Sequence, residues 1–319
     1  MGNIYPKISL ITPNFNGGEY LEQTICSVLD QKYPNLEYII IDGKSSDNSL
    51  NIIDKYRKYL HYFVSEPDFG QSDAINKGLK MCTGEIFNWL NSDDYYESSS
   101  LYIVADAFSS SKASIVSGNA NIVNKHGNKI RETRGIVQYS NLAKTIGWVA
   151  INQPEVFWKT NVVKQLGGIN PSLHYNMDKE LWIKYLLKFG MNNVLKVDKT
   201  LVNFRLQPLS KTVSQNDQFT IERDLLFASI AKWAGLTNEL EFIMKNNSIQ
   251  LPEFQIDIPK NNFLVQSIFQ YFFLLKADEY YVEGKIDQSK KFLDFIGSKI
   301  KLAEPRLFLS LFLKLKFRL

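Results

Sequence analysis

Hydrophobic and polar positions follow two different periods in the first hundred residues. Four short runs rich in β-branched and aromatic residues each end in a polar loop, as buried strands do; these runs are residues 7–13, 36–42, 61–67 and 85–91. Between the runs, apolar residues recur at helical spacing; the helical segments are residues 18–31, 47–60 and 71–82. The repeated order of strand and helix predicts a mainly parallel α/β sheet.

The loops that follow these four strands share one composition. Each is polar and carries Asp or Asn, and the loops are residues 13–18, 42–47, 66–71 and 91–94. Crossover helices place the carboxyl ends of parallel strands on one edge of the sheet, where ligands collect. The pattern therefore predicts one polar binding cleft at that edge.

The pattern changes after about residue 113. Residues 113–135 predict a hairpin that turns at 125–128, which makes the sheet mixed. Further strands are expected in 152–160 and 199–208, and a helix in 174–190. Beyond 215 the pattern is mainly helical, with a proline-containing linker at 250–262 and a helical hairpin at 277–300 around Gly284. We predict a catalytic domain at 1–215 and a helical C-terminal region at 216–319.

Composition adds two constraints. The chain has 319 residues, 45% of them hydrophobic, and a net charge of +4, which suits a large packed core. With two cysteines and no visible N-terminal signal we expect a reducing, cytoplasmic location. No apolar run is long enough to span a bilayer.

The positive charge gathers at the C-terminal end. Residues 260–319 hold eleven Lys or Arg and six Asp or Glu, and the last segment, EPRLFLSLFLKLKFRL, is apolar and basic. As a helix it could lie on the inner face of a membrane or pack on a partner; its last residues could instead form an edge strand.

Residues 91–94, Asn-Ser-Asp-Asp, follow the fourth predicted strand directly. Such residues are common in turns and helix caps. Two adjacent carboxylates at the carboxyl end of a strand could equally hold a metal ion. The residues alone leave both interpretations open.

Several ordered motifs over residues 7–206 resemble family 2 glycosyltransferases. They are ISLITPNFNGGEYLEQTICSVLDQKYPNLEYIIIDGKSSDNS, SEPDFGQSDAINKGLKMCTGEIFNWLNSDD, NQPEVFW and NMDKELW. The resemblance implies a GT-A fold, a Rossmann-like mixed sheet flanked by helices. It also implies an inverting transfer from a nucleotide-diphosphate sugar to a hydroxyl of a glycan or lipid-linked acceptor, in surface polysaccharide biosynthesis.

The NSDD sequence stands where this family carries its DXD motif, with Asn91 in place of the first Asp. The resemblance therefore implies that Asp93 and Asp94 bind Mn²⁺ or Mg²⁺. It implies a nucleotide-sugar site made of Pro13, Phe15, Asn16, Asp42, Asp68, Gln71, Asp93 and Gln153. Where the family often has a second Asp that contacts the base, this chain has Gly43.

Asp178 is the implied catalytic base, since it matches the family's Asp at the start of a helix that continues with Leu181 and Trp182. The alternative is an ordinary acid at a helix N-terminus. Gln207 stands where the family frequently has a His, and Lys211 could neutralise phosphate or lie in a solvated loop.

Other function classes fit less well. The first loop lacks the G-x-G-x-x-G pattern of dinucleotide enzymes and the chain lacks a Walker lysine motif. No nucleic-acid-binding motif is present, so we expect no nucleic-acid partner. A non-catalytic scaffold that acts through the basic C-terminal region remains the alternative.

Overall fold

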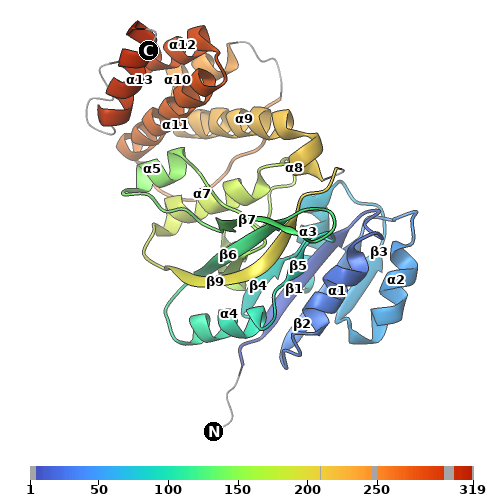
Figure 1. Cartoon of the computed structure of the whole chain (residues 1–319). Coiled ribbons are helices and arrows are strands. Elements are labelled where there is room, and N and C mark those ends of the chain that lie inside the picture. The colour runs from blue at the N-terminus through green and yellow to red at the C-terminus, as the bar shows by residue number, and fades with distance from the viewer. Residues whose placement is uncertain (1–4, 209, 246–249, 298–304, 318–319) are drawn as a thin grey trace. The chain divides into compact units, whose positions relative to one another are not determined.

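The computed structural model describes residues 5–208, 210–245, 250–297 and 305–317. Within these residues the chain forms one nine-stranded mixed sheet with helices around it (Figure 1). The strands are β1 Ile8–Asn14, β2 Leu36–Asp42, β3 Tyr62–Ser65, β4 Ile86–Trp89, β5 Tyr95–Tyr96, β6 Ile115–Val123, β7 Lys129–Arg134, β8 Val156–Lys159 and β9 Val194–Arg205. The predicted mixed α/β fold with C-terminal helices is confirmed.

Sheet order explains where a site can form. The strands run β3-β2-β1-β4-β8-β6-β9-β5, with β7 paired to β6. The first four are parallel, whereas β8 is antiparallel to β4. After β3 the chain crosses to the other side of β1 and forms β4, so the carboxyl ends of β1 and β4 flank a topological switch point.

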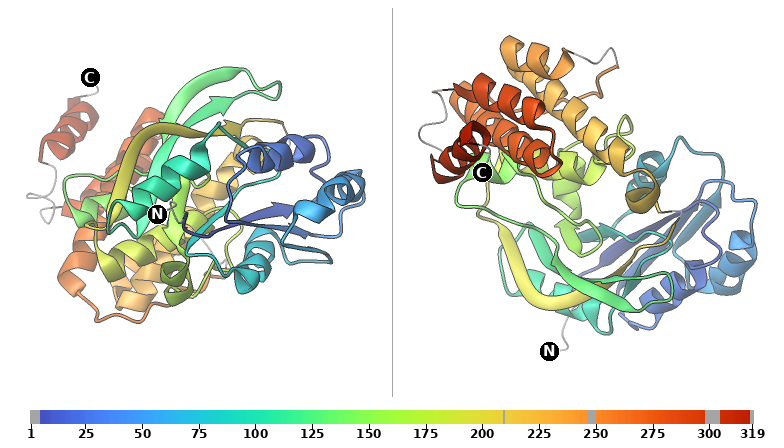
Figure 2. Two further views of the ribbon diagram at one scale, coloured as in Figure 1. Left: turned by 90° about the horizontal axis from the view of Figure 1, so that it is seen from below. Right: turned by 45° about the horizontal axis from the view of Figure 1, so that its top comes forward.

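The predicted helices of the first half are present, with shorter bounds. The helices of this part are α1 Leu21–Leu29, α2 Ser49–Tyr56, α3 Gln71–Met81, α4 Ser100–Ser109, α6 Thr160–Gln165, α7 Met177–Phe189 and α8 Lys211–Ser214, and a 3-10 turn spans Arg57–Tyr59. A Cβ on Gly78 would lie 2.7 Å from Ile11 Cδ1, so this glycine lets α3 pack closely on β1. The predicted hairpin of β6 and β7 is present and lies beside β9 (Figure 2); its connection is 124–128, one residue longer than the predicted turn at 125–128.

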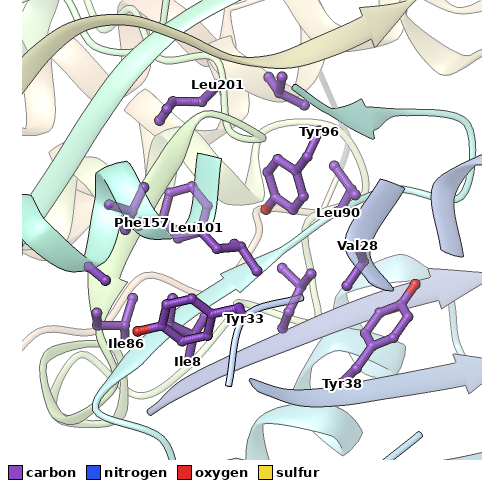
Figure 3. Packing of buried hydrophobic residues seen from close by; sticks show 14 of the residues in the cluster. Ile8, Val28, Tyr33, Tyr38, Ile86, Leu90, Tyr96, Leu101, Phe157 and Leu201 are labelled. Carbon is purple, nitrogen blue, oxygen red and sulfur yellow. The ribbon is translucent and has the colours of Figure 1, made fainter. Parts of the chain in front are cut away.

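A hydrophobic core fills one face of the sheet. Figure 3 shows side chains from the strands, including Ile8 and Phe157, packed against Val28 of α1 and Leu101 of α4. All four are fully buried. These contacts explain why the sequences of the strands are nearly continuous apolar runs.

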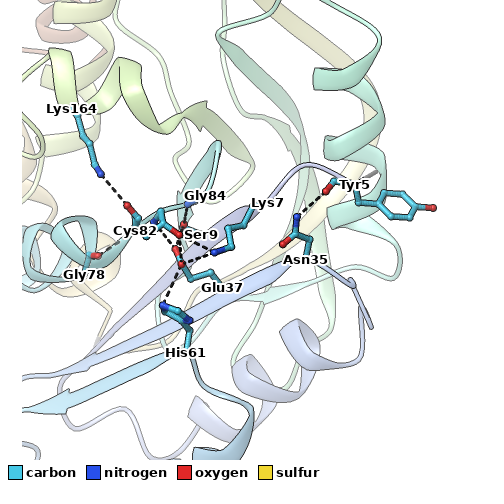
Figure 4. Close-up of polar contacts among 11 residues, drawn as sticks. Tyr5, Lys7, Ser9, Asn35, Glu37, His61, Gly78, Cys82, Gly84 and Lys164 are labelled. Atoms are coloured by element: carbon cyan, nitrogen blue, oxygen red, sulfur yellow. Dashed lines mark hydrogen bonds and ion pairs between the residues drawn. The ribbon is translucent and has the colours of Figure 1, made fainter. Parts of the chain in front are cut away.

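The amino edge of the sheet holds a buried acid, Glu37, which is 1% exposed (Figure 4). Ser9 Oγ donates to its carboxylate, and so do Thr83 N at 2.8 Å and Thr83 Oγ1 at 2.7 Å. Glu37 Oε1 also lies 3.4 Å from Lys7 Nζ and 3.3 Å from His61 Nε2. Burial raises the pKa of Glu37, but the bonds from Ser9 and Thr83 outweigh it and lower the pKa to about 2.

By compactness the chain divides into two units, residues 1–136 with 151–226 and residues 137–150 with 227–319. The boundary falls within α9 Asn216–Ala234. The second unit contains α5 Leu142–Gly147, α10 Thr237–Met244, α11 Asn262–Val282, α12 Ile286–Ile296 and α13 Pro305–Phe317. The domain boundary predicted at residue 215 stays a prediction, because compact packing does not establish independent folding.

The predicted hairpin around Gly284 exists, with φ 75° at the glycine, but its first helix begins at Asn262. Residues 250–261 contain no helix or strand, as the linker prediction requires. Residues 305–317 are helical, so an edge strand there is excluded. None of the described helices is both long and apolar enough to cross a membrane.

Candidate active site

The loops after β1 and β2 are held together by a buried carboxylate. Asp42 is fully buried. Its Oδ1 accepts hydrogen bonds from Asn14 Nδ2 at 2.7 Å and Ser45 Oγ at 2.6 Å. Its Oδ2 accepts hydrogen bonds from Ser45 N at 2.9 Å and Ser65 Oγ at 2.6 Å. Both oxygens are thus used inside the protein. Asp42 fixes the loops after β1 and β2 to each other, and its predicted contact with a nucleotide stays a prediction.

Three more predicted residues lie on the loop after β1. Pro13 is buried in the strand end, whereas the Phe15 side chain is 66% exposed. Asn16 adopts φ 50°, which Asn tolerates. Its Oδ1 accepts from Ser46 N at 2.8 Å, while its own N–H donates to Ser45 Oγ at 2.8 Å. This loop therefore presents the Phe15 ring to solvent.

The NSDD loop lies at the carboxyl end of β4, as the sequence predicts. Asp94 is buried and accepts from Arg205 N at 2.9 Å on Oδ1 and from Asn91 Nδ2 at 3.2 Å on Oδ2. Asp93 is partly exposed, and its Oδ2 accepts from Gln207 Nε2 at 3.3 Å. Asp93 is therefore the more available of the two carboxylates.

Electrostatics at this loop differ from those of an ordinary turn. Burial and then the neighbouring charge of Asp93 raise the pKa of Asp94 well above its usual value, and burial also raises the pKa of Asp93. The positive charge of Arg205 lowers both pKa values, but it does not offset the effect of burial. Hard divalent ions prefer carboxylate oxygens and complete their shell with substrate oxygens and water. The pair fits a Mn²⁺ or Mg²⁺ ion shared with a nucleotide diphosphate.

In the described part of the chain, no three His, Cys, Asp or Glu side chains gather around a point that could hold a metal.

Arg205, at the end of β9, clamps the NSDD loop and was not identified from the sequence. It is 2% exposed, and its Nε donates to the carbonyl of Asp93 at 2.9 Å. Its other nitrogens donate to Lys125 O at 2.9 Å and Gln23 Oε1 at 2.6 Å. The guanidinium also lies 4.5 Å from the Tyr20 ring centroid. Arg205 thus fixes the acidic loop to α1 and to the β6–β7 turn.

Asp178 is the second residue of α7 and is partly exposed. Burial raises its pKa to about 6, although the charge of Lys179 opposes this. A carboxylate with a pKa near neutrality is suited to accept a proton at physiological pH. The structure therefore gives the predicted base suitable electrostatics.

Glu222, from α9, holds the loop that leads to Asp178. Its carboxylate accepts from three successive backbone N–H groups, those of His174 at 2.7 Å, Tyr175 at 2.7 Å and Asn176 at 2.6 Å. Its charge also contributes to the raised pKa of Asp178. This role was not predicted from the sequence, because the helical pattern beyond 215 is weak.

Lys211 connects the loop before Asp178 to the acidic loop. Its Nζ donates to His174 O at 2.9 Å and to Gln71 Oε1 at 3.5 Å, and Gln71 Nε2 donates to Asn91 Oδ1 at 2.6 Å. Burial lowers the pKa of Lys211, opposed by the charges of Glu222 and Asp68. Lys211 begins α8 and is partly buried, so it does not lie in a loop, and its predicted role in neutralising phosphate stays a prediction.

Gln153 lies beside β4. It is 7% exposed, and its Nε2 donates to Asn88 Oδ1 at 2.8 Å and Trp89 O at 2.7 Å. Gln153 therefore supports the strand that carries the acidic loop, and its predicted contact with the sugar stays a prediction.

Comparisons with known proteins relate this chain to glycosyltransferases. Residues 9–162 match the sequence profile of Glycosyl transferase family 2. An uncharacterized glycosyltransferase of Rickettsia typhi is 25% identical over 81% of this chain and 82% of its own length. A putative teichuronic acid biosynthesis glycosyltransferase, TuaG of Bacillus subtilis, is 38% identical over 32% of this chain and 41% of its own length.

Solved structures share the fold. TarS 1-349 of S. aureus, in complex with UDP, has a TM-score of 0.58 and 16% identity over 98% of this chain and 87% of its own. The mannosyltransferase PcManGT of Pyrobaculum calidifontis, in complex with GDP-Man and Mn²⁺, has a TM-score of 0.55 and 13% identity, and the match covers 99% of this chain and 88% of PcManGT. With the fold, the acidic loop and these matches in place, we conclude that the chain is a glycosyltransferase of family 2.

Proposed function

We propose that this family 2 enzyme is inverting and metal-dependent, and that it moves one sugar from a nucleotide-diphosphate sugar to a hydroxyl group. The observation that carries the proposal is the hydrogen-bonded chain from the loop before Asp178, through Lys211 and Gln71, to the NSDD loop. It connects the loop before Asp178, whose carboxylate is suited to proton transfer, with the loop that carries Asp93 and Asp94.

Asp93 is the direct metal ligand in this proposal, because Asp94 uses both oxygens within the protein. Asp94 and Arg205 position the loop. When bound, the ion would neutralise charge on the departing diphosphate. The fold neighbour bound to GDP-Man and Mn²⁺ supports this choice of cofactor.

Asp178 acts as general base. It takes the proton of the acceptor hydroxyl as that oxygen attacks the anomeric carbon, while the nucleotide diphosphate leaves from the opposite face. Glu222 keeps the Asp178 loop in place through its backbone bonds. Lys211 provides a second positive charge for the diphosphate.

We propose a surface glycan or its lipid-linked precursor as the acceptor, met at the cytoplasmic face of a membrane. The relation to TuaG supports the glycan. The α13 helix supports the membrane, since Leu309, Phe312 and Leu313 are exposed beside the basic Arg306 and Lys314.

Vesicle flotation tests the membrane contact. The chain should float with anionic vesicles and less with zwitterionic ones, and the pair Leu309→Ser and Leu313→Ser should abolish flotation. Equal flotation of wild type and the double variant would exclude α13 as the contact.

Donor turnover tests the catalytic proposal. The protein is incubated with Mn²⁺, cell-envelope extract and a panel of UDP-, GDP- and dTDP-sugars, and released nucleotide diphosphate is measured. Wild type should release it from one donor class, whereas Asp178→Asn should bind that donor but release little. Binding without release by wild type would favour the scaffold alternative.

A further inference from the structure

Helix α1, which packs against β5, carries a row of polar side chains toward the segment that follows β4. Thr24 and Ser27 lie on α1 and Gln31 follows it, and spacings of three and four residues keep such positions on one side. Thr24 is 1% exposed and Gln31 is 7% exposed. Because Ser, Thr and Gln are mostly exposed in proteins, the partners of this polar row indicate its role.

Ser27 and Gln31 hold the chain that follows the acidic loop. Ser27 Oγ accepts from Tyr96 N at 3.1 Å. Gln31 Nε2 donates to Glu97 O at 2.8 Å, and Gln31 Oε1 accepts from Leu101 N at 3.3 Å. The polar row thus follows the backbone from the acidic loop to the start of α4.

Thr24 holds the acidic loop itself. Its Oγ1 lies 2.7 Å from Asp94 O and 3.0 Å from Ser92 O. In helices a Thr hydroxyl often donates to the carbonyl four residues earlier, but here that carbonyl, Tyr20 O, is 3.5 Å away. A hydroxyl has one hydrogen, so the two loop carbonyls share it. These carbonyls lie on either side of Asp93 in the chain.

Arg205 binds the carbonyl between these two, that of Asp93, through Nε at 2.9 Å. Three successive carbonyls, those of residues 92, 93 and 94, are therefore held by Thr24 and Arg205. The side chain of Asp93 remains partly exposed. The loop thus has a fixed backbone and an available carboxylate, which is the arrangement that a precise metal ligand needs.

We propose that Thr24 is a positioning residue for metal binding: its hydroxyl holds the backbone on both sides of Asp93, so that the Asp93 carboxylate can meet the ion. The inference rests on the proposed metal-dependent nucleotide site and adds a residue that does not touch the ion. Loss of a group that orients a metal ligand typically costs about 10- to 100-fold in metal affinity.

Thr24→Val tests the hydroxyl, because it keeps the shape of the side chain. Calorimetric titration uses whichever of UDP, GDP and dTDP the wild type binds best. With Mn²⁺ the variant should bind this nucleotide about tenfold more weakly or worse, and without metal its affinity should equal that of wild type. Thr24→Ser, which restores the hydroxyl, should recover most of the loss. If Thr24→Val does not fold, Thr24→Ala replaces it, since it removes the hydroxyl without placing a methyl group against the carbonyls.

Ser27→Ala is the matched control on the same helix. It removes the acceptor of Tyr96 N, so it should lower the midpoint of thermal unfolding without metal, as Thr24→Val should. Its Mn²⁺-dependent nucleotide affinity should nevertheless equal that of wild type. If both variants lost affinity in proportion to their loss of stability, Thr24 would be a structural residue only and the proposal would be wrong.

A double variant shows whether Thr24 acts through Asp93. Thr24→Val combined with Asp93→Asn should bind the nucleotide as Asp93→Asn alone does, because residues that act through one another do not have additive effects. Additive losses would overturn the proposal.

The outcomes separate this inference from the proposed function. If wild type showed no Mn²⁺-dependent nucleotide binding, the proposed function and this inference would both fail. If wild type bound the nucleotide with Mn²⁺ and Thr24→Val bound it equally well, only the positioning role of Thr24 would fail.

Discussion

The two edges of the parallel part of the sheet both carry acidic clusters, with opposite electrostatics. At the amino edge, four neighbouring residues donate to Glu37 and its pKa falls to about 2. At the carboxyl edge, burial raises the pKa values of Asp93 and Asp94, and the charge of Asp93 raises that of Asp94 further. Protein groups alone stabilise the charge of Glu37 at the amino edge. At the carboxyl edge, protein groups do not fully stabilise the charges of Asp93 and Asp94.

This difference separates structural acids from functional ones. A satisfied buried carboxylate stabilises the fold. A buried carboxylate without full compensation costs stability, and such groups are concentrated at functional sites. Changes at the two edges should therefore affect different properties, and four substitutions test this.

Asp178→Asn should have the largest effect. Turnover should fall about 10²- to 10⁴-fold, as for loss of a general base, while nucleotide binding is retained. Because the native pKa lies above the ordinary value of 3.8, the ionised group opposes folding above about pH 4. The variant should therefore be as stable as wild type, or about 1 kcal/mol more stable at pH 7 after allowance for solvent screening. Initial rates and thermal unfolding measure both.

The pH dependence of wild type provides the control. Its kcat/KM should fall as pH decreases through about 6, where Asp178 gains a proton. A flat profile between pH 5 and 7 would contradict the assignment.

Asp93→Asn should weaken Mn²⁺-dependent nucleotide binding about a hundredfold, because it removes the proposed metal ligand. Without metal, the free energy of unfolding of the variant should equal or exceed that of wild type. The pKa of Asp93 is raised in the folded protein, so its ionised form opposes folding, and the variant lacks this charge. Calorimetry and thermal unfolding on one preparation test this. Reduced stability with unchanged binding would place Asp93 with the structural acids.

Glu37→Gln should show the reverse pattern. It should reduce the free energy of unfolding by about 2 to 3 kcal/mol at pH 7, with unchanged turnover per folded molecule. Since the native pKa is depressed, the stabilisation by Glu37 is present above about pH 4.5 and is lost as pH falls toward 2. Denaturant unfolding at several pH values measures the difference between wild type and variant. If the difference in free energy of unfolding persisted at pH 2, the charge of Glu37 would not be the source of the stabilisation.

Glu222→Gln should have the smallest effect, about a tenfold loss in kcat, because one oxygen remains for the loop before Asp178. Nucleotide affinity should not change. Steady-state kinetics separate the two values, and an equal loss in nucleotide binding would show a general loosening of the fold.

The sequence predicted the elements with strong periodicity. Residues 36–42 match β2 in full because its apolar run is continuous. The strand β5 has two residues, Tyr95–Tyr96, too few to show a period. Helix α7 was expected from 174, but it begins at Met177, and residues 174–176 form a loop whose backbone N–H groups donate to Glu222.

For the site, the sequence indicated the acidic residues better than their surroundings. Asp93, Asp94 and Asp178 were identifiable by motif, but their raised pKa values depend on burial. The Glu222 contact spans 48 positions to His174. The bonds that occupy Asp42 come from Asn14, Ser45 and Ser65 on three segments. Only folding brings such partners together.

The central claim is that the carboxyl edge is a metal-dependent nucleotide site. Calorimetric titration of wild type and Asp93→Asn with UDP, GDP and dTDP, each with and without Mn²⁺, tests it most directly. Wild type should bind one nucleotide tightly only with Mn²⁺, and Asp93→Asn should lose this dependence. Binding that is unaffected by both Mn²⁺ and the substitution would contradict it.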